Sequence, residues 1–111
     1  MQNGQPKKME TPPIDFAELR DKGQKFAPES KSLKLCVYEP ERKLLLIDFM
    51  GQGDSTYIYF DVGQETWDAL ISAESAGSYF HKHIRTQAHR SVNNFPFAKV
   101  QKDDAGKEFL E

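Results

Sequence analysis

The sequence STYIYFDVGQETWDALISAE, residues 55–74, decides the fold because its hydrophobic rhythm changes part-way along. Up to Val62, aromatic and β-branched residues stand at nearly every position, which is typical of a β-strand. Beyond it the apolar residues recur at helical spacing, at Trp67, Leu70 and Ile71. We therefore predict a strand that leads directly into an amphipathic helix.

Two further strands are predicted before this one. Residues 31–38 alternate, with Leu33, Leu35 and Val37 on one face, and residues 43–49 are apolar on both faces, as in a central strand. The connections between the three strands are short, so they should form an antiparallel meander.

A second helix is predicted to begin at Ser75, whose hydroxyl can cap its first turn. One face of this helix carries apolar and aromatic side chains: Ala76, Tyr79, Phe80, His83 and Ile84. The opposite face is polar and basic: Ser78, His81, Lys82 and Arg85. The apolar faces of both helices need a partner, and the sheet offers one.

The predicted fold is therefore α+β: a three-stranded antiparallel β-meander with two C-terminal helices packed on one face. Residues 93–100 are expected to return to the domain as a short C-terminal strand or extended segment. We take residues 30–100 as the ordered domain.

Both ends of the chain are expected to be flexible. Residues 1–29 are polar and broken by prolines, so they are predicted to form an N-terminal arm. A short helix is expected within this arm, with Asp15 as its N-cap and Gly23 at its end. Either the arm is mobile or this helix docks onto the domain. Residues 101–111 are expected to be a flexible polar tail.

Composition narrows the class of protein. The net charge is −2, so any electrostatic recognition must come from local patches. The single cysteine, Cys36, excludes an intramolecular disulfide and does not imply an oxidising compartment. No apolar run approaches the length of a membrane span, and residues 1–8 lack the apolar region of a secretory signal. We expect a cytoplasmic protein that does not bind membranes.

Charge is divided unevenly along the chain. Residues 29–74 carry nine acids and four bases, whereas residues 75–102 carry five bases, three histidines and no acid. Lys82, Arg85 and Arg90 could therefore pair with phosphates. The aromatic residues near the cations of this segment could stack on bases: Tyr79, Phe80, Phe95 and Phe97. The alternative is that these cations form the solvated face of an amphipathic helix, favourably placed near its C-terminus.

Tyr57 and Tyr59 project to the same face of the third predicted strand. Facing outward they would form a platform for a base or a partner's side chain, and facing inward they would pack under a helix. Ile58, Phe60 and Val62 form the other face and look more core-like, which favours partial exposure of the tyrosines.

The order of these motifs resembles the KTSC family, named for a domain at the C-terminus of some lysyl-tRNA synthetases. That domain also occurs alone in small bacterial and phage proteins. The resemblance covers about residues 31–87 and depends on Tyr57-x-Tyr59 followed by AGSYFHKHIR at residues 76–85. Gly63 departs from the pattern, since a proline often starts the helix there. The resemblance implies RNA binding only because the domain is associated with tRNA synthetases, and not because the family has a defined binding site.

Catalysis and metal binding have little support in the sequence. Cys36 reads as a small buried residue within a strand. His81 and His83 are two apart in a predicted helix and point in different directions. No phosphate loop, dinucleotide fingerprint or nucleophile elbow is present. We therefore predict a non-catalytic module with no cofactor and no metal.

Two functions remain open from the sequence. The first is binding of RNA or another nucleic acid through a basic helix face. The alternative is a protein-interaction module that uses exposed aromatic residues and a sheet edge. The residues predicted to contact nucleic acid are Tyr57, Tyr59, Lys82, Arg85 and Arg90.

Overall fold

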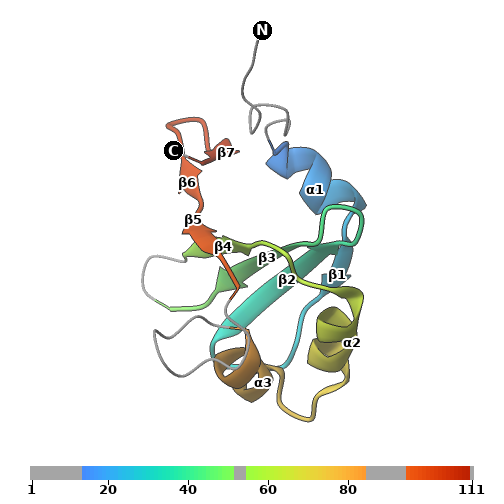
Figure 1. Cartoon of the computed structure of the whole chain (residues 1–111). Coiled ribbons are helices and arrows are strands. Elements are labelled where there is room, and N and C mark those ends of the chain that lie inside the picture. The colour runs from blue at the N-terminus through green and yellow to red at the C-terminus, as the bar shows by residue number, and fades with distance from the viewer. Residues whose placement is uncertain (1–13, 52–54, 85–94, 111) are drawn as a thin grey trace, which may run out of the picture.

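The computed structural model describes residues 14–51, 55–84 and 95–110. Its centre is an antiparallel sheet in the order β1-β2-β3-β4-β5, and a separate two-stranded sheet is formed by β6 and β7 (Figure 1). In chain order the elements are α1 (Phe16–Lys22), β1 (Gln24–Phe26), β2 (Leu33–Glu39), β3 (Leu44–Phe49), β4 (Thr56–Tyr59), α2 (Gln64–Ser72), α3 (Ala76–His83), β5 (Phe97–Lys99), β6 (Gln101–Lys102) and β7 (Glu108–Phe109).

The predicted mixed α+β class and the antiparallel meander of β2, β3 and β4 are confirmed, but the predicted number of three strands is wrong. Strand β1 adds to one edge, with Phe26 opposite Cys36. Strand β5 adds to the other edge, with Phe97 opposite Tyr59, in the segment where a short strand was expected. Strand β1 was not predicted because its three residues include only one apolar side chain and so show no alternation of polar and apolar residues.

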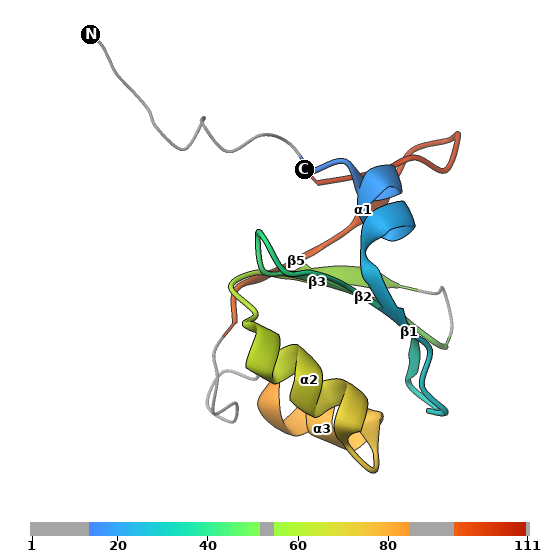
Figure 2. The ribbon, with the colours of Figure 1, turned by 90° about the vertical axis from the view of Figure 1, so that its right-hand side faces the viewer.

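Helices α2 and α3 both pack on one face of the sheet, as predicted (Figure 2). The Trp67 ring of α2 stacks on Tyr38 of β2, with 5.3 Å between centroids. The Phe80 ring of α3 contacts Phe49 of β3 and Tyr59 of β4, with centroid distances of 5.3 and 5.6 Å. Helix α2 therefore covers β2, and α3 covers β3 and β4.

Local signals fix where these helices begin. The Ser75 hydroxyl accepts a hydrogen bond from the Ser78 backbone N–H at 3.2 Å, as the sequence predicts for an N-cap. Helix α2 begins after Gly63 without a side-chain cap, so tertiary packing of Trp67 and Leu70 holds it in place. None of the described helices has the length and apolar character needed to span a membrane.

The opposite face of the sheet is covered by α1 (Figure 2). Phe16 and Leu19 are buried there against the apolar side chains of β2, β3 and β4. Asp15 caps the helix by accepting from the Glu18 backbone N–H at 3.1 Å, and the helix ends at Gly23, both as predicted. Of the two alternatives for the N-terminal arm, residues 14–26 show the docked helix, because its apolar face packs against the sheet.

Gly23 joins α1 to β1 at a point where the backbone lies very close to the sheet. A methyl group at this position would come within 2.5 Å of Val37 Cγ1 and 2.7 Å of the Leu19 carbonyl oxygen. The absence of a side chain therefore allows the chain to turn directly from α1 into the edge strand.

The C-terminal segment also packs on this second face. Val100 is buried there, and Leu110 packs against the same cluster. Between them Asp103 accepts hydrogen bonds from the backbone N–H groups of Ala105 and Lys107, which closes the β6–β7 hairpin. The expected flexible tail is thus an ordered hairpin from residue 101 to 109. The apolar residues of this hairpin are isolated in a polar sequence, so they form no hydrophobic period from which the hairpin could be predicted.

Candidate functional site

Tyr59 is enclosed between two other rings. It is 4% exposed, with Phe80 of α3 on one side at 5.6 Å and Phe97 of β5 on the other at 5.8 Å between centroids. The expected partial exposure therefore does not hold for Tyr59, because α3 and β5 together cover it. The Tyr59 ring stacks against the side of the Phe97 ring that faces the sheet interior.

Tyr57 lies on the same face of β4 and is half-buried. Its ring contacts Phe49 at 5.9 Å and Phe97 at 6.0 Å between centroids. Lys99 of β5 stands directly opposite it in the ladder. Tyr57 therefore lies at the boundary between the core and the surface of the β4–β5 pair.

Phe97 is the exposed aromatic residue of this surface, and our sequence-based list omitted it. It is 46% exposed, and its ring stacks on Tyr59 with 28° between the two planes. Lys99 is exposed two residues further along β5, so both side chains project to the same face of the strand. We call Tyr57, Phe97 and Lys99 the edge platform. The sequence reasoning named Phe97 among the rings beside cations but did not include it or Lys99 among the predicted contact residues.

Backbone hydrogen bonds hold the edge platform on both sides of β5. The Pro96 carbonyl accepts from the Phe60 N–H at 2.9 Å, before the strand begins. The Val100 N–H donates to the Thr56 carbonyl at 2.9 Å, after the strand ends. The three-residue strand is therefore fixed at both ends and presents Phe97 and Lys99 in a defined orientation.

Of the three predicted cations, the structure describes one. Lys82 is exposed in the last turn of α3, between His81 and His83. Arg85 and Arg90 lie outside the described residues. Helix α3 reaches Phe97 only through Tyr59, which its Phe80 contacts. Lys82 is two residues from Phe80 and therefore projects from a different side of the helix.

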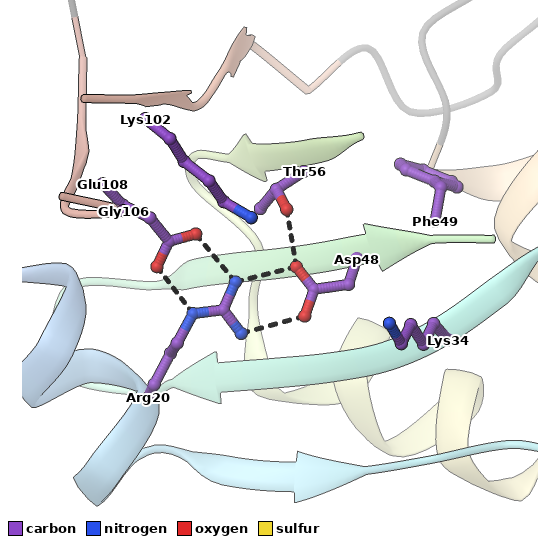
Figure 3. A pocket seen from close by; sticks show the side chains of 8 residues that line it. All are labelled: Arg20, Lys34, Asp48, Phe49, Thr56, Lys102, Gly106 and Glu108. Atoms are coloured by element: carbon purple, nitrogen blue, oxygen red, sulfur yellow. Dashed lines mark hydrogen bonds and ion pairs between the residues drawn. The ribbon is translucent and has the colours of Figure 1, made fainter. Parts of the chain in front are cut away.

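A polar pocket of about 370 Å³ lies on the opposite face of the sheet (Figure 3). At its centre, Arg20 of α1 donates to both carboxylate oxygens of Asp48 at 2.7 and 2.9 Å. It also donates to both carboxylate oxygens of Glu108 at 2.7 and 2.8 Å. The Thr56 hydroxyl donates to Asp48 at 2.7 Å. One guanidinium thus joins α1, β3 and β7.

These hydrogen bonds decide the protonation states in the pocket. Burial acts to raise the pKa of Asp48, but the hydrogen bonds from Arg20 and Thr56 outweigh it and lower the pKa below its ordinary value. Hydrogen bonds to Glu108 and then to Asp48 raise the pKa of Arg20. The guanidinium and the Asp48 carboxylate therefore stay charged. Their ion pairs hold α1, β3 and β7 together.

A β-bulge shapes the rim of this pocket. Leu33 pairs with Phe49 and Leu35 pairs with Asp48, so the register shifts by one residue at Lys34 of β2. Its side chain lines the pocket together with Lys102 of β6. The pocket therefore mixes three cations with two carboxylates, and its central charges already satisfy one another.

Neither nucleophilic nor metal chemistry is favoured by the described residues. Cys36 is fully buried, and burial raises its pKa to about 12, so the thiol is not a thiolate at neutral pH. Within residues 14–51, 55–84 and 95–110, no group of three or more His, Cys, Asp or Glu side chains is arranged to hold a metal ion.

Comparison with protein families identifies a domain in this chain. The model of the KTSC domain matches residues 29–87 of this chain. The matched region holds β2, β3, β4, α2 and α3, whereas α1, β1 and the three C-terminal strands lie outside it.

Curated relatives match parts of this chain. A protein of Tsukamurella paurometabola is 35% identical over 51 residues, which is 46% of this chain and 73% of the relative. An uncharacterized protein of Stutzerimonas stutzeri is 31% identical over 67 residues, covering 60% of this chain and 92% of the relative. A lysine–tRNA ligase of Nostoc sp. is 36% identical over 75 residues, covering 66% of this chain but only 13% of the ligase.

A solved structure has the same fold. The crystal structure of a KTSC domain protein from Yersinia pestis matches with a TM-score of 0.58 and 27% sequence identity. The match covers 70% of this chain and 97% of that protein.

Proposed function

The chain belongs to the KTSC domain family, and we propose that it is a non-catalytic, cytoplasmic module that binds RNA or another nucleic acid through the edge platform and the basic surface beside it. The observation that carries this proposal is the exposed Phe97 ring, fixed on an edge strand next to Lys99. An aromatic face beside a cation is the arrangement that single strands use, through stacking and phosphate pairing.

The distribution of charge supports the same surface. Lys82 and Lys99 are exposed on α3 and β5, and no acid occurs anywhere from residue 75 to 102. Residues 75–102 therefore offer a phosphate several cations and no carboxylate of their own. In the proposal Lys82, Arg85 and Arg90 pair with phosphates.

The two tyrosines take different parts in the proposal. Tyr57 forms the inner wall of the edge platform, because it is half-buried and contacts Phe97. Tyr59 is too enclosed to meet a ligand and instead supports the Phe97 ring. Phe97 replaces Tyr59 as the stacking residue.

One relative adds support for RNA as the ligand. The Nostoc protein that shares this region is named a lysine–tRNA ligase, so a homologous segment occurs in a protein that acts on a tRNA. The shared segment is a small part of that ligase, and the proposal for this chain depends on its own surface.

Binding of a fluorescently labelled RNA at two salt concentrations tests the proposal. We expect the affinity to fall steeply between 50 and 200 mM salt, since each phosphate contact releases counterions (the slope of log affinity on log salt is about −0.7 per contact for a single strand). The double variant Lys82→Glu with Lys99→Glu should bind at least about tenfold more weakly and show a shallower slope.

Lys25→Glu is the matched control for charge reversal. Lys25 is exposed on β1, at the opposite edge of the sheet from β5. Its variant should keep most of the affinity. Binding that ignores salt, or that weakens equally in the Lys25 variant, would contradict the proposal.

Protein binding is the second candidate, and one observation favours it. Strand β5 is the edge of the main sheet, and edge strands accept an additional strand from a partner. A protein captured from lysate after nuclease treatment, and lost on Tyr57→Ala with Phe97→Ala, would favour this function over nucleic-acid binding.

A further inference from the structure

We infer that the edge platform receives an unpaired base on the outer face of Phe97, with the phosphate of that nucleotide at Lys99, so that the ligand is single-stranded. This inference rests on the proposed function and narrows it to one class of nucleic acid. It depends on how the rings of the platform are covered.

The Phe97 ring has one covered face and one open face. Tyr59 stacks against its inner side, at 5.8 Å and 28°, and Tyr57 lies beside it at 6.0 Å and 45°. Nearly half of Phe97 remains exposed to solvent. A flat ring that already stacks on its inner side can extend the stack outward by one more flat ring, and every base offers such a face.

Lys99 stands where the phosphate of a stacked nucleotide would lie. Phe97 and Lys99 are two residues apart on one strand, so their side chains project in parallel from points roughly 6.6 Å apart. A base and its own phosphate are separated by a similar span. The pair therefore suits one nucleotide whose base stacks and whose phosphate pairs with an ammonium group.

The edge platform needs little rearrangement before it binds. Hydrogen bonds at Pro96 and Val100 hold β5 to β4 on both sides of Phe97 and Lys99. A ring that is already fixed loses little conformational freedom on binding, so most of the stacking interaction contributes to affinity.

A duplex cannot use this arrangement along its length. Within a double helix each base is stacked on its neighbours, and only base edges are presented in the grooves. The face of Phe97 then has no partner, and phosphate contacts alone remain. The ring therefore predicts a preference for unpaired nucleotides that charge by itself would not give.

Three labelled probes of equal length test this inference: an oligo-uridine, an oligo-thymidine and an RNA duplex. We expect both single strands to bind the full-length protein at least about tenfold more tightly than the duplex, since stacking of one base contributes on this order. Either order of affinity between the two single strands supports the inference, provided that both exceed the duplex.

Substitutions at Phe97 assign the preference to the ring. Phe97→Leu keeps an apolar side chain but removes the flat face, and should lose about tenfold in affinity for the single strands only. Phe97→Trp should retain the affinity, and the emission of the introduced indole should be quenched when a base stacks on it. Phe109→Leu, at another exposed phenylalanine on β7, is the matched control and should bind as the wild type does.

Failure of the inference differs from failure of the proposed function. Equal, salt-dependent binding of duplex and single strands, unchanged by Phe97→Leu and without indole quenching, would overturn the inference and leave nucleic-acid binding standing. Absence of salt-dependent binding to all three probes would overturn both, and would leave the edge platform to a protein partner.

Discussion

Arg20 connects residues that are far apart in the chain. Its hydrogen-bond partners Asp48 and Glu108 lie 28 and 88 positions away, and their side chains are only 18% and 9% exposed. Carboxylates that are largely removed from water depend on a paired cation, because an unpaired charge in such a place is costly. The guanidinium therefore stabilises the second face of the sheet by satisfying two charges at once.

Replacing this guanidinium should destabilise the fold. We expect Arg20→Met to lower the free energy of unfolding by about 2–3 kcal/mol, since it keeps the aliphatic stem but removes the cation that pairs with both carboxylates. Urea denaturation at pH 7 measures the loss. Lys22→Met, which removes only the exposed pair with Glu18, should change stability by less than about 0.5 kcal/mol. Equal losses in the two variants would contradict this account.

The Asp48 carboxylate should make stability depend on pH. Its pKa is lower in the folded than in the unfolded state, so its contribution is present above the unfolded value and is lost as pH falls through the folded value. Asp48→Asn should therefore cost about 2 kcal/mol at pH 7, and the difference from wild type should shrink below about pH 4.

Denaturation midpoints at pH 7 and at pH 3 measure this difference. Asp104→Asn, at an exposed carboxylate of the β6–β7 turn, is the matched control. A gap between wild type and Asp48→Asn that stays constant or widens at pH 3 would show that the charged form is not what stabilises the pocket.

At the scale of elements, α1 is part of the sheet's packing although it lies outside the family match. Leu19 is 3% exposed and packs with the apolar side chains of the second face. We expect Leu19→Ala to cost about 2–4 kcal/mol, through lost burial and the cavity that remains. Ala17→Ser, at an exposed position of the same helix, should change stability little. Unchanged thermal unfolding in Leu19→Ala would mean that α1 is not docked.

Periodic segments were predictable from the sequence, whereas β1 and the β6–β7 hairpin were not. Strands β2, β3 and β4 and helices α2 and α3 each contain enough residues to show a hydrophobic period, and Ser75 and Asp15 marked two helix starts. Strand β1 and the β6–β7 hairpin contain two or three residues per strand. Their positions depend on contacts with residues that are distant in the chain, and a local sequence pattern cannot predict such contacts.

The tyrosine prediction shows why the candidate site was only partly predictable. Ile58 was correctly assigned to a buried face, and this made the face of Tyr57 and Tyr59 look exposed. Both faces of β4 are covered, one by α3 and the other by α1 and the C-terminal segment. The pattern of one strand cannot reveal that both of its faces are covered, because the covering helices α1 and α3 lie elsewhere in the chain.

At the scale of the whole molecule, the two faces of the sheet are covered by different parts of the chain. The face under α2 and α3 belongs to the region matched by the KTSC family and borders the edge platform. The face under α1 holds the Arg20 cluster and is covered by segments outside that match. Substitutions on the second face should therefore affect stability, whereas those on the edge platform should affect binding.

Titration of ¹⁵N-labelled protein with oligo-uridine, followed by backbone amide chemical shifts, tests the central claim most directly. We predict that the largest shifts fall on β5, around Phe97 and Lys99, and on the last turn of α3 around Lys82. The amides of α1, across the sheet, should stay in place. Largest shifts at Arg20 and Glu108, or no shifts at saturating oligonucleotide, would contradict the account.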